Sequence, residues 1–212
     1  MTPTIEAIIF DIGGVFVHVY RPEVFRAIEA RLGLRAGVLA SVLWRSDDWR
    51  LAEVGAISDE EYWRRTAPRL GLSTPEAVDE LNAALFGDVR LDPDLVHLVR
   101  RLRGRYRTAM LSNASDAVGS DRWRARYAVD GLFDVEIVSA RVGLAKPGEA
   151  IYRLALERLG VAPEAAVFID DSPPNVAAAS ALGIHAIHFT GYQALVEALR
   201  QLGVVSDGEN SA

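Results

Sequence analysis

Residues 5–14 read Ile-Glu-Ala-Ile-Ile-Phe-Asp-Ile-Gly-Gly, and this stretch decides the fold. The apolar run from Ile5 to Phe10 is short and rich in β-branched side chains, which is typical of a buried strand. The run ends at Asp11, and the glycine pair that follows indicates a turn. The sequence therefore predicts a carboxylate at the C-terminal end of a buried strand, where parallel sheets bind their ligands.

The rest of the chain divides into two patterns. Apolar residues recur at helical spacing over residues 21–86, which predicts about four helices, one of them opened by a capping box from Ser58 to Glu61 and another by Pro75. From Asp92 onward the pattern alternates between strands and helices. Strands are expected at 107–111, 135–139, 165–169 and 184–188, and helices at 93–102, after 111, at 148–159, at 175–182 and up to about residue 202.

This alternation predicts an α/β fold, with a Rossmann-like parallel-sheet core sandwiched by helices and an inserted all-helical cap domain. We expect residues 1–16 and 88–205 to form the discontinuous core, residues 17–87 the helical cap, and residues 206–212 a disordered tail. An insertion that leaves the ligand-binding edge of the sheet can fold back as a lid. The turn at 55–58, between two helices of the insertion, could reach over the site.

Composition excludes several functional classes. The chain has 212 residues, is 50% hydrophobic and carries a net charge of -6, which suits one sizeable core and disfavours nucleic acid as a partner. It has no cysteine, hence no disulfide or thiolate site. No run of about 20 apolar residues predicts a membrane span, and no signal peptide is evident. We expect a soluble cytoplasmic protein with no membrane partner, either a monomer or a homodimer.

Polar side chains follow the predicted strands at a common edge of the sheet. Asp11 follows the first strand, Ser112-Asn113 the second and Asp170-Asp171 the fourth, while Lys146 lies in the loop after the third. Three carboxylates close together need a cation, and hard oxygen ligands suit Mg²⁺. The Ser112 hydroxyl and the Asn113 backbone amide would bind phosphate, and Lys146 would neutralise both phosphate and carboxylates.

Lys146 is the only lysine among the 23 basic residues of the chain. A chain that uses arginine everywhere else retains a lysine where a compact ammonium is required and a planar guanidinium cannot replace it. This observation favours a functional role for Lys146 over chance. A carboxylate such as Asp11 can act as a nucleophile and form an aspartyl-phosphate.

Four segments, in this order, resemble the four motifs of the haloacid dehalogenase (HAD) superfamily: Phe10-Asp11-Ile12-Gly13-Gly14-Val15, Leu111-Ser112-Asn113, Lys146-Pro147 and Phe168-Ile169-Asp170-Asp171-Ser172. The helical insertion after the first motif resembles the cap of its sugar-phosphate phosphatase and epoxide hydrolase N-terminal phosphatase-like branch. The resemblance implies a Mg²⁺-dependent phosphatase that acts on a small phosphorylated metabolite, such as a sugar phosphate.

The resemblance also implies roles for single residues. Asp11 would be the nucleophile and a metal ligand, with the Gly13 carbonyl as a second ligand and Asp171 as a third. Asp170 would complete the metal site by positioning Lys146 or a metal-bound water, and Asn175 would hold another water. Ser112, Asn113 and Lys146 would bind the phosphate, and Asp11 and Lys146 would be the catalytic pair.

One position departs from the family pattern. Most phosphatases of the superfamily carry a general acid two residues after the nucleophile, but this chain has Gly13 there. Three explanations are open. The leaving group could need little protonation, or His18, a cap residue or water could act as the acid instead. The protein could also be a catalytically weak phosphate-binding module. A 2-haloacid dehalogenase, which needs no such acid, is a further alternative, although the Asp170-Asp171 pair favours a metal-dependent phosphatase. Trp44, Trp49 and Trp63 are expected mainly to pack, and one could line the substrate pocket.

Overall fold

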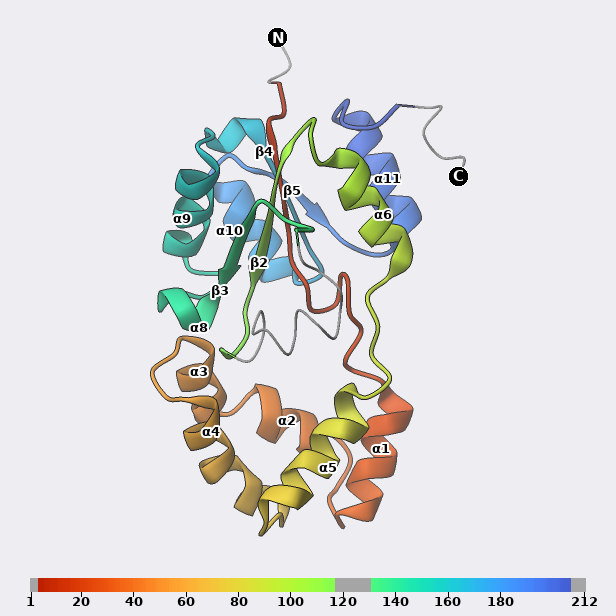
Figure 1. The fold of residues 1–212 in the computed structure, drawn as a ribbon, viewed down its shortest axis with the longest axis vertical. Coiled ribbons are helices and arrows are strands. Elements are labelled where there is room, and N and C mark those ends of the chain that lie inside the picture. The colour runs from red at the N-terminus through yellow and green to blue at the C-terminus, as the bar shows by residue number, and fades with distance from the viewer. Residues whose placement is uncertain (1–3, 117–130, 207–212) are drawn as a thin grey trace.

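The structure, a computed structural model, describes residues 4–116 and 131–206. Within those ranges five parallel strands form one sheet in the order β3-β2-β1-β4-β5 (Figure 1). The central strand β1 (Ala7–Phe10) pairs with β2 (Arg107–Ser112) and β4 (Ala166–Asp170), and the edges are β3 (Val135–Val138) and β5 (His185–His188). The predicted α/β fold with a parallel sheet is confirmed.

Helices cover both faces of the sheet, as Figure 1 shows. Side chains of a strand alternate between faces, so Ile8 and Phe10 pack with α6 (Pro93–Leu102) and α11 (Tyr192–Gln201). Ala7 and Ile9 pack on the opposite face with α9 (Glu149–Leu159) and α10 (Pro173–Ala181). Because β1 is buried on both faces, its sequence shows a continuous apolar run rather than an alternating one.

Residues between β1 and α6 form a helical insertion with an apolar cluster of its own, centred on Phe25, Leu39 and Leu81. Figure 1 shows it below the sheet, beyond the strand ends. Its elements are α1 (Pro22–Arg31), α2 (Val38–Trp44), α3 (Asp47–Glu53), α4 (Asp59–Thr66), the 3-10 helix η1 (Ala67–Leu70) and α5 (Pro75–Phe86).

The expected number of about four helices in this segment was too low, because α3 is a separate helix. Ser46 begins it by accepting a hydrogen bond from the Trp49 backbone amide (3.2 Å). Ala52 is the one buried residue of α3, so the helix shows little apolar periodicity in the sequence. Half of the predicted capping box is confirmed, since the Ser58 hydroxyl accepts from the Glu61 amide (3.1 Å). The Glu61 carboxylate instead accepts from Arg64 and Arg65.

Other boundaries differ by one or two residues from those expected, and two short helices, α8 (Ser139–Val142) and the 3-10 helix η2 (Pro163–Ala165), were not predicted. The helix expected after β2 falls largely on residues 117–130, and the expected tail on 207–212; both lie outside the described residues. Across the described part of the chain, no helix combines the length and apolarity that crossing a bilayer requires.

Candidate active site

The C-terminal ends of two adjacent strands, β1 and β4, bring the three predicted carboxylates together. Asp11 follows β1, and Asp170 and Asp171 stand at the end of the neighbouring strand β4. Each of the three offers an oxygen, and these oxygens lie within 4.8 Å of one another. Ser112, buried at the end of β2 on the other side of β1, completes this edge.

The Lys146 ammonium ties the strand ends together. Its Nζ donates to Asp11 Oδ1 (2.8 Å), to Asp170 Oδ2 (2.7 Å) and to the Leu111 carbonyl (2.9 Å). Burial acts to lower the pKa of Lys146, but the charges of Asp11 and Asp170 outweigh it and hold the pKa above its usual value. The three N–H donors of the ammonium are thus all used within the protein, so a phosphate oxygen must share one of them.

The Asp170 carboxylate is buried and holds four hydrogen bonds. Oδ1 accepts from the Ser172 amide (2.8 Å) and Asn175 Nδ2 (3.0 Å), while Oδ2 accepts from Lys146 and from Asn175 Nδ2 (3.1 Å). These partners fix the Asp170 carboxylate next to Lys146. Asp11 and Asp171 are therefore the carboxylates better placed to bind a cation directly. The Asn175 side-chain amide points to Asp170.

Burial raises the pKa of Asp11 to about 6, against the lowering effect of Lys146. Asp171 is exposed, but burial of part of its side chain and the charge of Asp170 raise its pKa as well, while the charges of Lys146 and His18 lower it. His18 therefore lies near the carboxylates on an exposed position after β1. His188, from β5, donates to the Asp171 backbone carbonyl (3.0 Å), which is a structural role.

The charge and chemistry of the cluster fit a divalent cation. Three carboxylates and one ammonium leave two negative charges at this edge of the sheet, which match the charge of one Mg²⁺. The donors are hard oxygens, and Asp11 and Asp171 come from separate loops on adjacent strands. Gly13, two residues beyond Asp11, lies in the turn closed by the hydrogen bond from the Phe16 amide to the Ile12 carbonyl (2.9 Å).

Gly14 leaves the space that the Asp171 carboxylate fills. Its φ is +78°, and a Cβ at this position would lie 2.1 Å from Asp171 Oδ2. We expect Gly14→Ala to lower the free energy of unfolding by about 1–3 kcal/mol, because the variant residue is strained and displaces Asp171. Calorimetric titration with Mg²⁺ should also show weaker binding to this variant.

Gly33→Ala is the matched control for Gly14→Ala. Gly33 also has a positive φ of +67°, but a Cβ there would meet no atom within 4 Å. Gly33→Ala should therefore lose stability from backbone strain alone and bind Mg²⁺ like the wild type. Equal Mg²⁺ affinities in the two variants would mean that Asp171 does not take part in a cation site.

Asn113 fixes the loop that carries Lys146. Its Nδ2 donates to the Lys146 carbonyl (2.8 Å) and its Oδ1 accepts from the Lys146 amide (2.9 Å). The side chain is thus engaged within the protein, and the predicted phosphate contact of Asn113 falls to its backbone amide. The structure brings Asp11, Ser112, Asn113, Lys146, Asp170 and Asp171 to one edge of the sheet, as the sequence predicted.

The sequence analysis missed one side chain near this edge, Glu53. It ends α3 in the insertion, is half-buried, and lies close to the side chains of Asn113 and Trp49. Burial raises the pKa of Glu53, while the polar side chains of Asn113 and Trp49 and the charges of Lys146 and Arg50 act to lower it. The signal that could have found it is its place directly before the turn at 55–58, which was expected to reach over the site.

The tryptophans of the insertion differ in their surroundings. Trp44 packs on Phe25 (5.2 Å between ring centroids) and Trp63 on Tyr62 (5.3 Å), as expected for packing residues. Trp49 also packs on Tyr62 (5.8 Å), but it touches Glu53 as well. Trp49 is therefore the one of the three that lies beside Glu53.

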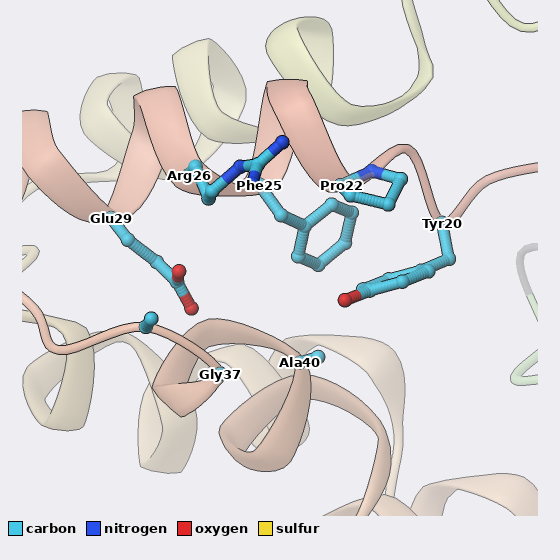
Figure 2. Close-up of a pocket in the computed structure, with 8 residues that line it drawn as sticks. Tyr20, Pro22, Phe25, Arg26, Glu29, Gly37 and Ala40 are labelled. Atoms are coloured by element: carbon cyan, nitrogen blue, oxygen red, sulfur yellow. The ribbon is translucent and has the colours of Figure 1, made fainter.

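A separate cavity of about 170 Å³ lies within the insertion, between α1 and α2 (Figure 2). Figure 2 shows the Tyr20 ring and the Glu29 carboxylate facing it from opposite ends. The Glu29 carboxylate is buried and accepts a hydrogen bond from the Leu39 amide (3.0 Å), which joins the two helices. This cavity shares none of the strand-end residues, so it is not part of the carboxylate site.

Most of the sequence matches a known family. A family model described as haloacid dehalogenase-like hydrolase matches residues 5–183. A sesquiterpene phosphatase from Aspergillus oryzae is 27% identical over 202 residues, which cover 95% of this chain and 98% of that protein. An (S)-2-haloacid dehalogenase from Burkholderia cepacia is 22% identical over 197 residues, covering 88% of this chain and 84% of that one.

Solved structures share the fold. A HAD-like family hydrolase from Porphyromonas gingivalis has a TM-score of 0.73 and 27% identity, and the match covers 93% of this chain and 98% of that one. A HAD family enzyme from Bacteroides thetaiotaomicron, in complex with magnesium and inorganic phosphate, has a TM-score of 0.72 and 22% identity, covering 86% and 93%. The second likeness, at its low identity, concerns the fold alone.

Proposed function

Since this chain belongs to the haloacid dehalogenase-like hydrolases, we propose that it is a Mg²⁺-dependent phosphatase that transfers the phosphoryl group of a small phosphorylated metabolite to Asp11. The observation that carries the proposal is the Lys146 ammonium, which bridges Asp11 (2.8 Å) and Asp170 (2.7 Å) beside a third carboxylate, Asp171. A dehalogenase that expels an anion needs no such excess of carboxylates.

The residues of the site divide the work of phosphoryl transfer. Lys146 holds the Asp11 carboxylate by Oδ1 and orients the remaining oxygen for attack on phosphorus. Ser112, at the end of β2, and the Asn113 amide supply hydrogen bonds to the phosphoryl oxygens, and Asp170 holds Lys146 in place. Asp11, Asp171 and the Gly13 carbonyl would hold Mg²⁺, which neutralises charge on the transferring phosphoryl group when bound.

The test is steady-state hydrolysis of a panel of phosphate esters by the purified protein. The panel should contain sugar phosphates and terpenyl phosphates, because a sugar phosphate is the substrate class that the sequence suggests and a relative of nearly equal length is a sesquiterpene phosphatase. A panel of 2-haloacids, assayed for halide release, belongs beside it. Halide release without phosphate release would identify a dehalogenase and overturn the proposal.

Removal of the metal provides a separate prediction. Chelation with EDTA should lower phosphate release by at least about 10²-fold, since a metal supplies several kcal/mol of charge stabilisation in the transition state. Addition of Mg²⁺ in excess of the chelator should restore the rate. Phosphate release that persists after complete chelation would contradict a metal-dependent reaction.

A phosphate-binding protein without turnover is the second candidate, and Gly13 is the observation that favours it. Such a protein would bind a metal-fluoride mimic of the phosphoryl group and hydrolyse no ester of the panel. Turnover by the wild-type protein, lost on chelation, would exclude this candidate.

A further inference from the structure

Glu53 stands where the insertion meets the carboxylate site. It ends α3, which contacts the short helix α8 next to the end of β3. Two residues on, Gly55 has a φ of +68°, and a Cβ there would lie 2.1 Å from the Ala140 carbonyl oxygen of α8. The turn after Glu53 is therefore seated against the core so closely that only glycine fits. Glu53, two residues before this contact, lies close to Asn113, which directly follows β2.

The surroundings of Glu53 are unfavourable for a permanent charge. Three carboxylates already lie at this edge of the sheet, and a bound phosphate ester would add further negative charge. Among residues 4–116 and 131–206, two cations act on Glu53: Lys146, already paired with Asp11 and Asp170, and Arg50, already paired with Asp47 (3.1 Å). Arg141 of α8 pairs with Asp116 (2.7 Å). A carboxyl group in this position is favoured when it carries a proton.

We propose that Glu53 is the general acid and base of the reaction, in place of the residue that Gly13 lacks. The proposal rests on the proposed phosphatase function and names the group that acts on the leaving oxygen. In the first step an Asp11 oxygen forms a bond to phosphorus while the ester P–O bond breaks, and the departing oxygen takes the proton of Glu53. In the second step the Glu53 carboxylate takes a proton from water as the water oxygen attacks phosphorus and the Asp11–phosphorus bond breaks. The sum is ester plus water to alcohol plus phosphate, with Asp11 and Glu53 restored.

Burial raises the pKa of Glu53, and a higher pKa is the direction that suits a proton donor. Trp49, whose ring packs on Tyr62, lies beside Glu53 on the same helix. The acid would thus come from the insertion and not from the first loop of the core. Protonation of the leaving group would then depend on the contact between the insertion and α8.

The test uses Glu53→Gln. Glutamine keeps the size and shape of the side chain and can still form hydrogen bonds, but it has no acidic proton. Rates are compared as kcat/KM, which reports the steps up to departure of the alcohol, for 4-nitrophenyl phosphate and for an alkyl phosphate such as glycerol phosphate. We expect a fall of about 10²- to 10⁴-fold for the alkyl ester. The fall for 4-nitrophenyl phosphate should be less than about tenfold, because its leaving group needs no proton.

The pH profile supplies a second measurement. Activity that needs protonated Glu53 must decline as pH rises through its pKa, and this alkaline limb of kcat/KM for the alkyl ester should disappear in Glu53→Gln. Equal losses for the two esters, no loss, or an unchanged alkaline limb would each overturn the role of Glu53. The control Glu80→Gln makes the same chemical change on exposed α5 and should match the wild type.

The same rates separate a wrong assignment of Glu53 from the absence of phosphatase activity. If wild-type protein hydrolyses no ester of the phosphate panel, the phosphatase function fails. If wild-type protein hydrolyses both and Glu53→Gln shows no dependence on the leaving group, the function stands and Glu53 is not the acid.

Discussion

Replacing Asp11 with asparagine should leave the protein folded and lower phosphate release by at least about 10⁴-fold, because an amide cannot form the aspartyl-phosphate. The side chain keeps its size, and Lys146 keeps Asp170 (2.7 Å) and the Leu111 carbonyl (2.9 Å) as partners. The measurement is steady-state phosphate release at saturating Mg²⁺. Rapid acid quench of the wild-type reaction should in addition trap a phosphoprotein that hydroxylamine cleaves, and Asp11→Asn should form none.

The same variant should be at least as stable as the wild type without metal. Burial raises the pKa of Asp11 from 3.8 to about 6 in the folded protein, so the folded state binds more protons than the unfolded state between those values. Ionisation of Asp11 therefore costs stability as pH rises through about 4 to 6, and this cost persists at neutral pH. Asparagine does not ionise, so the variant avoids this loss of stability. Such a gain is expected where a residue serves function at the expense of stability.

Asp79→Asn on exposed α5 is the matched control, and we expect it to change neither turnover nor stability. Turnover by Asp11→Asn within tenfold of this control would mean that another group attacks phosphorus. A large loss of stability in Asp11→Asn, seen in urea unfolding, would show that the Asp11 charge supports the fold.

Replacing Lys146 with arginine should lower phosphate release by about 10²-fold or more and destabilise the fold by about 1–3 kcal/mol. The side chain is 1% exposed, so the larger guanidinium has no free space. The ammonium also directs its three donors at Asp11, Asp170 and the Leu111 carbonyl, which lie around one nitrogen. A planar guanidinium cannot reproduce that arrangement. It would displace Asp11, whose carboxylate would then no longer be in line for attack on phosphorus.

Arg158→Lys, at an exposed position of α9, controls for the exchange of the two cations. It should leave both urea unfolding and turnover unchanged. Wild-type turnover in Lys146→Arg would show that the compact ammonium is not required, and that the single lysine of this chain is incidental to the reaction.

The sheet was predictable because its strands depend on short-range pattern. β1 and β4 are buried on both faces, so their apolar runs are continuous and end at Asp11 and Asp170. In a parallel sheet the C-terminal ends meet at one edge, whatever the packing of the helices. The convergence of the carboxylates, Ser112 and Lys146 follows from that geometry, and it is the part of the site that the sequence predicted.

The helical insertion was less predictable because its packing decides which segments are helical. α3 buries Ala52 alone and begins at a serine cap, so its apolar spacing carries little information. The hydrogen-bond partners of Lys146 were also not predictable. The sequence does not show that its three donors are shared among two carboxylates and a backbone carbonyl.

The sequence by itself determined the parallel sheet, the edge at which its polar residues meet and the excess of negative charge there, because strand periodicity and strand ends are local properties. Tertiary structure alone decided that Glu53, 42 residues beyond Asp11 in the numbering and on a different element, comes to lie beside Asn113. That contact depends on how α3 seats on α8 through Gly55, a packing of two elements that no local pattern specifies.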